Sequence, residues 1–285
     1  MYAVTGITGK VGSAVAKALL GNGAKVRAVL RDPAKGESWA QLGCEIALAE
    51  MTDAPSLSTA FEGVEGVFLL IPSCFDPTPG FPEVRQVIDA LQTAIASAKP
   101  PKIVCLSTIG AQAKEPNLLN QLGLVEQALG ALDIPVAFLR AAWFMENAAW
   151  DVSDARRHGT IQSFLQPLDQ PVPMVATSDI GVCAAAMLRE NWQGRRVVEL
   201  EGPNRVTPND LAAGFAAILG QPVEVTAVPR GAWEEMFRAQ GAQNPVFRAR
   251  MLDGFNEGWI CFEGETRRGA TKLRAVLTRL VQGSE

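Results

Sequence analysis

Short runs of apolar and β-branched residues alternate along the first half of the chain with segments of helical periodicity. In the helical segments, apolar residues recur every three or four positions, and the clearest stripe is Val84, Val87, Ile88, Leu91 and Ile95. The runs predict strands at 2–5, 26–30, 45–48, 67–71, 103–107 and 136–140. The stripes predict helices at 11–21, 57–61, 84–99 and 118–132.

Strands that alternate with helices in this way are typical of right-handed crossover units and a parallel sheet. A strand such as 67–71 has almost no polar position, as expected for a strand that is covered by helices on both faces. The pattern predicts an α/β protein with a Rossmann-like, doubly wound parallel sheet. In such a fold the ligand crevice lies beyond the carboxyl ends of the strands.

After about residue 145 the regular alternation of predicted strands and helices ends. Further strands are expected near 172–176 and 197–200, returning toward the sheet, and helices at 180–191, 208–219, 231–239 and 245–256. Asp179 and Thr207 precede two of these helices and are the residue types that cap helix N-termini. We therefore expect a Rossmann domain at 1–145 and a small, mostly helical C-terminal lobe at 146–285.

Composition excludes several classes of protein. Hydrophobic residues make up 48% of the 285 residues, which supports a sizeable core, and the net charge of −4 without a basic stripe argues against a nucleic-acid partner. The five cysteines are far apart, and the single histidine cannot build a histidine-rich metal site, so we expect reduced thiols and no metal. No apolar run approaches the roughly 20 residues of a membrane span. The expected location is the cytoplasm, without a membrane partner.

Three glycines, Gly6, Gly9 and Gly12, join the first strand to the first helix. Glycines at such a turn let the backbone approach a pyrophosphate closely, and the helix N-terminus presents free N–H groups to it. The position after a strand and before a helix predicts a dinucleotide site. The expected cofactor contacts in the turn are Gly6, Thr8, Gly9, Lys10, Val11 and Gly12.

The end of the second strand bears on the choice of cofactor. An arginine there would bind the 2′-phosphate of NADPH, whereas an acid would accept hydrogen bonds from the ribose of NADH. Arg31 comes first after the strand and favours NADP(H), with Lys35 adding positive charge. Asp32 keeps NAD(H) as the alternative, or it only begins the turn with Pro33.

The Gly-x-x-Gly-x-x-Gly spacing resembles the extended and atypical short-chain dehydrogenase/reductases. Five stretches, spread over most of the chain, resemble the NmrA-like family of that group: 4–9, 31–33, 61–68, 139–147 and 177–181. The most specific of them reads Leu-Arg-Ala-Ala-Trp-Phe-Met-Glu-Asn at 139–147. The resemblance implies an NADPH-dependent oxidoreductase, nearest the quinone reductase type, acting on a small quinone-like or carbonyl acceptor. Other members of this family are regulators that bind NADP without turning it over.

The resemblance also implies site residues in the loops that follow the third to sixth strands. Beside the adenine would lie Glu50 and Met51, and beside the ribose and pyrophosphate Ile71, Pro72 and Ser73. The nicotinamide ribose would lie near Ser107 and Thr108, and the acceptor near Trp143, Phe144 and Asn147. The carboxyl ends of parallel strands are also where the fold itself predicts ligand contacts. Ser107 or Thr108 would orient the acceptor and are the candidate catalytic residues.

The usual proton donor of the short-chain dehydrogenases is missing. Their Tyr-x-x-x-Lys pair cannot be built, because the only tyrosine is Tyr2, in the first strand. Some relatives keep a lysine or histidine where this chain has Leu122, and the neighbouring Asn120 and Gln121 are not acids at neutral pH. Solvent could protonate a reduced quinone, so an enzyme remains the leading hypothesis. The alternative is a non-catalytic NADP(H)-sensing regulatory protein.

Three further features stay open at this point. His158, near a helix end, is either a capping cation or an acid of the pocket. Cys74, after the fourth strand, is either a passive or a redox-sensitive thiol. Helically spaced aromatic residues between 233 and 251 indicate core packing or a subunit contact, so the partner could be a second copy of the chain or a regulatory protein.

Overall fold

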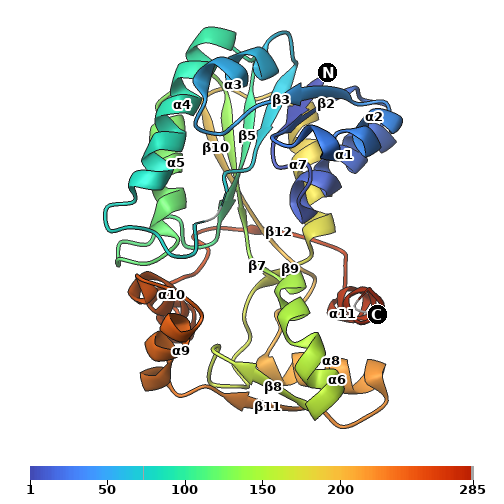
Figure 1. Cartoon of the computed structure of the whole chain (residues 1–285), viewed down its shortest axis with the longest axis vertical. Helices are drawn as coiled ribbons and strands as arrows, with labels where there is room; N and C mark the ends of the chain where they lie inside the picture. The colour runs from blue at the N-terminus through green and yellow to red at the C-terminus, as the bar shows by residue number, and fades with distance from the viewer. Residues whose placement is uncertain (73, 284–285) are drawn as a thin grey trace.

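The computed structural model describes residues 1–72 and 74–283. Within them, an eight-stranded parallel sheet forms the centre of the upper domain in Figure 1, in the order β12-β10-β6-β5-β4-β1-β2-β3. The strands are β1 (Tyr2–Val4), β2 (Val26–Leu30), β3 (Glu45–Leu48), β4 (Gly66–Leu69), β5 (Ile103–Thr108), β6 (Val136–Ala141), β10 (Arg195–Glu201) and β12 (Thr266–Arg268). The predicted doubly wound α/β fold is confirmed.

Helices cover both faces of this sheet (Figure 1). One layer holds α1 (Lys10–Gly21) and α7 (Thr177–Arg189), and the other holds α3 (Ala54–Phe61), α4 (Pro82–Ala98) and α5 (Asn120–Leu129). Neighbouring residues of one strand enter different layers: Val104 packs toward α1 and α7, and Ile103 packs toward α3 to α5. This double coverage explains why the strands carry no polar face. The short α2 (Glu37–Gln41) lies between β2 and β3 in the chain.

The contact between α1 and α7 depends on a glycine. A Cβ added to Gly181 would lie 2.4 Å from the Cβ of Ala14, so only a residue without a side chain lets the two helices approach this closely. Because α1 begins at the glycine turn, the packing of α7 also holds that turn in place. This gives a structural reason for the glycine in the stretch 177–181.

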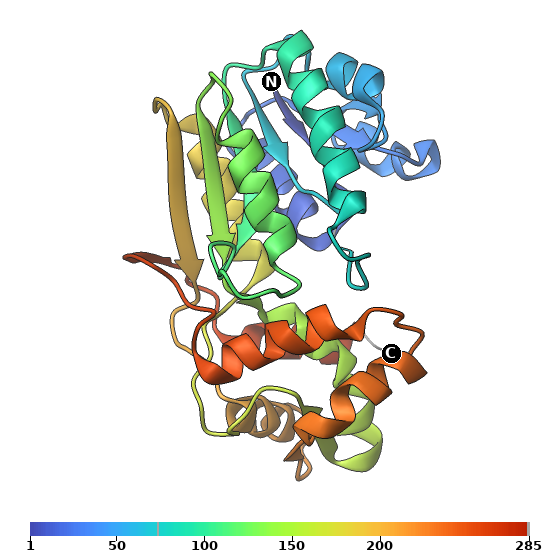
Figure 2. The same ribbon diagram turned by 90° about the vertical axis from the view of Figure 1, so that its left-hand side faces the viewer.

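A second lobe lies beyond the carboxyl ends of the strands (Figures 1 and 2). Its helices are α6 (Val152–His158), α8 (Pro208–Leu219), α9 (Trp233–Ala239), α10 (Pro245–Glu257) and α11 (Leu273–Gln282), joined to the sheet through the 3-10 helix η2 (Met145–Trp150). Its two-stranded pairs are β7 (Trp143–Phe144) with β9 (Met174–Val175) and β8 (Thr160–Ser163) with β11 (Glu224–Ala227). Its core includes Trp233 and Phe237, both fully buried.

Two expectations about this half of the chain have opposite outcomes. Thr207 caps α8 as predicted, in a reciprocal capping box with Asp210. The prediction that Asp179 caps α7 is wrong, because the helix begins two residues earlier at Thr177. The Asp179 carboxylate instead accepts hydrogen bonds from the backbone N and the Oγ1 of Thr271, at 2.8 and 2.6 Å.

The predicted strand near 197–200 is the inner part of β10, which pairs with β6 in the main sheet. Both α7 and β10 therefore return to the sheet after the chain has entered the lobe, and a division at residue 145 stays a prediction. No helix within 1–72 and 74–283 has the length and apolar character that crossing a membrane requires.

Candidate functional site

The glycine turn sits where the order of the sheet reverses, between β1 and β4. The Thr5 hydroxyl fixes the turn to the loop after β4, because its Oγ1 accepts a hydrogen bond of 2.8 Å from the backbone N of Leu70. Gly6 has a φ of +61°, which favours glycine, and its carbonyl accepts a hydrogen bond from the N–H of Gly9 at 2.9 Å. The turn is therefore tight and anchored to the neighbouring strand.

Gly12 allows the helix to begin directly on this turn. A Cβ at that position would lie 2.2 Å from the carbonyl oxygen of Gly6. The first turn of α1 carries no acidic residue, and its N-cap, Gly9, has no side chain to satisfy the free N–H groups. Thr8 and Lys10 are exposed while Val11 is buried beneath them. This end of the helix fits an anion such as a pyrophosphate.

Arg31 lies open at the end of β2. Its side chain is 72% exposed, and the nearest carboxylate, that of Glu50, is 4.0 Å from its Nη1. Asp32 is occupied locally: its Oδ1 accepts a 3.0 Å hydrogen bond from the N–H of Ala34 and caps the 3-10 helix η1 (Pro33–Lys35). The Asp32 carboxylate thus caps the turn that begins with Pro33, whereas the Arg31 guanidinium is exposed and has only a long ion pair with Glu50. Lys35 is exposed beside it.

The other predicted cofactor contacts also follow strand ends. Glu50 is exposed and Met51 is half-buried after β3, while Ile71 is buried and Pro72 exposed after β4. The predicted contact Ser73 lies outside the described residues.

Lys10 links the glycine turn to the lobe. Its Nζ donates a 3.4 Å hydrogen bond to the carbonyl oxygen of Glu146, in η2. The buried carboxylate of Glu146 in turn accepts hydrogen bonds from the backbone N and the Oγ1 of Thr177, at the start of α7. The turn, the lobe and α7 are therefore connected around one edge of the crevice.

The two candidate catalytic hydroxyls lie in different surroundings. Ser107 is buried, and its Oγ donates a 2.6 Å hydrogen bond to Oε1 of Glu126 on α5. Thr108, the next residue and the last of β5, is half-buried, and its Oγ1 donates a 3.1 Å hydrogen bond to the carbonyl oxygen of Ile109. Successive strand residues point to opposite faces, so the two hydroxyls cannot serve the same ligand atom.

The partner of Ser107 belongs to a buried charge network that the sequence did not reveal. Arg140 binds Glu126 through two hydrogen bonds, Nε to Oε1 at 2.9 Å and Nη2 to Oε2 at 2.8 Å. Its Nη1 also donates to Glu263 at 2.6 Å, and Glu199 lies 3.5 Å away. These carboxylates raise the pKa of the Arg140 guanidinium even though burial opposes the charge. The sequence carries two signals of this network: Arg140 is a charged residue in the apolar strand β6, and Glu126 is a charged residue on the apolar face of α5.

The predicted acceptor residues line the junction between sheet and lobe. Trp143 packs edge-on against Phe255 of α10, with ring centres 5.2 Å apart. Phe144 packs against the core beneath α1 and α7, and Asn147 is half-buried in η2. Sequence reasoning missed Phe255, whose helical spacing alone indicated only packing.

The chain's tyrosine and its histidine both lie away from this junction. Tyr2 is the first residue of β1, at the opposite end of the strand, and burial raises the pKa of its hydroxyl. His158 is exposed at the end of α6, at the far end of the lobe (Figure 1). The Asn120 and Gln121 amides are engaged by backbone carbonyls, those of Ala113 and Cys74 respectively.

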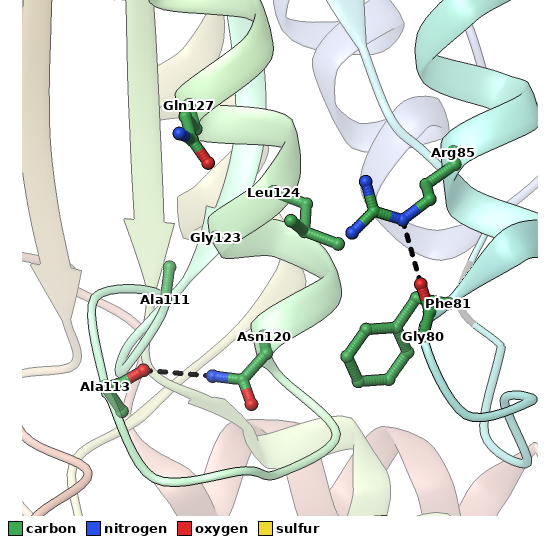
Figure 3. A pocket seen from close by; sticks show the side chains of 9 residues that line it. All are labelled: Gly80, Phe81, Arg85, Ala111, Ala113, Asn120, Gly123, Leu124 and Gln127. Atoms are coloured by element: carbon green, nitrogen blue, oxygen red, sulfur yellow. Dashed lines mark hydrogen bonds between the residues drawn. The ribbon is translucent and has the colours of Figure 1, made fainter.

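A separate surface pocket of about 430 Å³ lies on the flank of α5, facing the start of α4 (Figure 3). Its lining includes Phe81, Leu124 and Gln127, and its one charged residue is Arg85, whose Nε donates to the carbonyl oxygen of Gly80. None of the predicted site residues lines it. The predicted cofactor contacts therefore lie at the carboxyl ends of the strands and not in this pocket.

Comparison with known proteins agrees with this geometry. The model of the NmrA-like family matches residues 2–247. The NAD(P)H azoreductase of Xenophilus azovorans is 27% identical over 230 residues, which are 80% of this chain and 77% of that protein. Quinone oxidoreductase 2 of Escherichia coli is 27% identical over 225 residues, 78% of this chain and 76% of the relative.

A solved structure of a similarly named protein resembles the fold of this chain. The structure of an NADPH-dependent quinone oxidoreductase from Escherichia coli, complexed with NADPH, superposes with a TM-score of 0.82 at 24% identity and covers 98% of this chain and 99% of that one. The resemblance expected from the motifs is confirmed over most of the chain, which belongs to the NmrA-like family.

Proposed function

We propose that this protein is an oxidoreductase that uses NADPH to reduce a small, flat, quinone-like or carbonyl acceptor. The observation that carries the proposal is the glycine turn, in which Gly6 and Gly12 touch and the start of α1 is left free for a pyrophosphate. The names of two relatives support the chemistry, since one is an NAD(P)H azoreductase and the other a quinone oxidoreductase.

The residues of the chain would hold the cofactor at two places, its central pyrophosphate and the phosphate on its adenosine ribose. The free N–H groups at the start of α1 bind the pyrophosphate, and Lys10 adds a positive charge at the same place. Arg31 pairs with the 2′-phosphate, which makes the cofactor NADP(H) in preference to NAD(H). When bound, the dihydronicotinamide supplies a hydride to the acceptor.

Around the acceptor, the chain provides a wall and one hydroxyl. We assign the orienting hydroxyl to Thr108, because it is half-buried, whereas the Ser107 hydroxyl is buried and donates a shorter hydrogen bond to the Glu126 carboxylate. The ring of Trp143, held by Phe255, forms an apolar wall for a flat molecule. With Tyr2 and His158 both remote, the acceptor favoured is one whose reduced form takes its proton from water, as a quinone does.

The test is to follow NADPH absorbance with a panel of quinones, azo compounds and aldehydes, alongside calorimetry with NADPH and NADH. We expect NADPH to bind more tightly than NADH and to be oxidised with at least one quinone. Tight NADPH binding without oxidation by any acceptor would favour the regulatory alternative. Failure to bind either cofactor below millimolar concentration would refute the cofactor site itself.

Arg31→Ala tests the 2′-phosphate contact directly. Loss of a charge-assisted pair of this kind costs about 1.5–3 kcal/mol, so we expect NADPH to bind at least about tenfold more weakly, while the affinity for NADH stays within about twofold. Arg274→Ala, an exposed residue of α11, is the control for the change in net charge. Equal losses for the two cofactors in Arg31→Ala would contradict the assignment.

A further inference from the structure

Helix α10 spans the junction between the sheet and the lobe. At its start, the Asp76 carboxylate in the loop after β4 accepts hydrogen bonds from the N–H groups of Gln243 and Asn244, at 2.8 and 2.6 Å. Near its end, Phe255 packs on Trp143, which follows β6. Figure 2 shows the helix running beneath the loops at the carboxyl ends of the strands. The helix therefore lies across the junction and faces the carboxyl ends of the strands.

Helix geometry places Arg248 on the same side of α10 as Phe255. Arg248 and Phe255 are seven residues apart, which is close to two turns, so their side chains leave the same side of the helix about 10 Å apart. The preceding residue, Phe247, also faces the sheet, since its ring centre lies 5.0 Å from that of Phe81 at the start of α4. Arg248 thus lies between two aromatic contacts that both belong to the junction of lobe and sheet.

The surroundings of Arg248 differ from those of its neighbours. Its guanidinium carbon lies 4.2 Å from the centre of the buried Phe237 ring, and no carboxylate of residues 1–72 and 74–283 is within 4.0 Å of it. The other two arginines nearby, Arg230 and Arg250, both pair with Asp253. Arg248 is half-buried, and this burial lowers the pKa of its guanidinium. It stays charged at neutral pH, because the unperturbed pKa of arginine is so high.

Arg248 combines a half-buried, ring-stacked guanidinium with the lack of an anionic partner among the described residues. Removing the charge from water costs free energy, and a ligand that brings an anionic group returns it. The net charge of the chain is −4, so attraction of an anion to this place is a local property of Arg248 and not of the protein as a whole. The half-buried ring of Trp143 offers an apolar face for the rest of such a ligand.

We propose that Arg248 binds an anionic oxygen group of the acceptor, a carboxylate, sulfonate or phosphate, and thereby selects flat acceptors that carry an acidic substituent. The inference rests on the proposed reductase function of the same crevice. It assigns Arg248 to substrate binding only: the residue takes no part in hydride transfer, and Arg31 remains the contact for the cofactor phosphate.

The test compares a naphthoquinone sulfonate with its unsubstituted parent naphthoquinone as acceptors. For Arg248→Met we expect KM for the sulfonate to rise about tenfold or more, with KM for the parent quinone and for NADPH within about twofold of wild type. Arg248→Lys, which keeps the charge but loses the planar fork, should lie between the two. Arg250→Met, on the solvent side of the same helix, makes the same change in net charge and should leave the ratio of the two KM values unchanged.

A binding measurement separates this proposal from the reductase function. Calorimetry on the protein loaded with NADP⁺ uses naphthalene sulfonate and the neutral naphthalene sulfonamide, which have nearly the same shape. We expect wild type to prefer the sulfonate and Arg248→Met to lose that preference. No turnover with any quinone, together with this preference, would refute the reductase and leave the anion site standing. Equal effects of Arg248→Met on charged and neutral compounds, in either assay, would overturn the role of Arg248.

Discussion

Replacing Gly12 by alanine puts a methyl group where the glycine turn leaves no room. The added Cβ would lie 2.2 Å from the carbonyl oxygen of Gly6, 2.5 Å from its carbonyl carbon and 2.8 Å from the backbone N of Ile7. All three are backbone atoms, so no side-chain rotation relieves the overlap. The start of α1 must therefore move about 1 Å away from the turn to restore ordinary van der Waals contact.

Such a movement affects both stability and cofactor binding. Overpacking a tight site costs about 1–3 kcal/mol, and we expect the free energy of unfolding in urea to fall by that amount. A 1 Å displacement of the first N–H groups of α1 removes at least one charge-assisted hydrogen bond to the pyrophosphate, worth about 1.5–3 kcal/mol. Calorimetry should then show NADPH binding at least about tenfold more weakly.

Two other glycines of the same segment provide graded controls. At Gly9 an added Cβ would meet only the Gly6 carbonyl oxygen, at 3.3 Å, and we expect an intermediate loss of affinity. At Gly21, the last residue of α1, nothing lies within 4 Å, so alanine should leave NADPH binding unchanged and stabilise the helix by up to about 1 kcal/mol. Wild-type affinity and stability in Gly12→Ala, or equal damage from Gly21→Ala, would refute the steric argument.

Two further variants test buried charges. Glu126→Gln removes the bidentate carboxylate of Arg140 while Glu263 and Glu199 stay beside the guanidinium, and we expect about 1.5–3 kcal/mol less unfolding free energy in urea; an unchanged midpoint would contradict this. Burial, with the like charge of Asp154, raises the pKa of Asp151 from 3.8 to about 7, so the folded state holds the proton more tightly and stability falls as pH rises between these values. Asp151→Asn should remove that fall and be more stable than wild type at pH 8, by up to about 4 kcal/mol. Parallel stability profiles of the two proteins would exclude it.

The fold could be predicted from the sequence because helices cover both faces of its main sheet. Strands such as β4 and β5 are almost wholly buried, and their helices are amphipathic, so both periods stand out along the chain. The short strands of the second half carry no such pattern. β8 (Thr160–Ser163) and β12 (Thr266–Arg268) have mostly exposed, polar residues, and their conformation is set by pairing with β11 and β10.

The site was predictable to the extent that backbone geometry controls it. The turn from Gly6 to Gly12 and the open position of Arg31 follow from local sequence, because each depends on a strand end and the residues next to it. The partner of Ser107 does not, since Glu126 reaches it only through the packing of α5 on β5. Asp32 is a similar case: the sequence left two roles open, and the hydrogen bond to Ala34 shows the local one.

The crevice offers a candidate acceptor charge and aromatic surfaces, but neither the chain's tyrosine nor its histidine, and this combination bears on the type of acceptor. Reduction of an aldehyde or ketone produces an alkoxide, a strong base that needs an acid in the transition state. Reduction of a quinone produces a phenolate-like anion, which is far less basic and can take its proton from water afterwards. With Arg31 assigned to the cofactor phosphate, the charge proposed for the acceptor is that of Arg248, which suits a flat molecule that carries an anionic group. The proposed preference for quinone-like acceptors thus has two grounds. Tyr2 and His158 are too far away to donate a proton to the acceptor, and Trp143 and Arg248 provide an aromatic face and a positive charge for it.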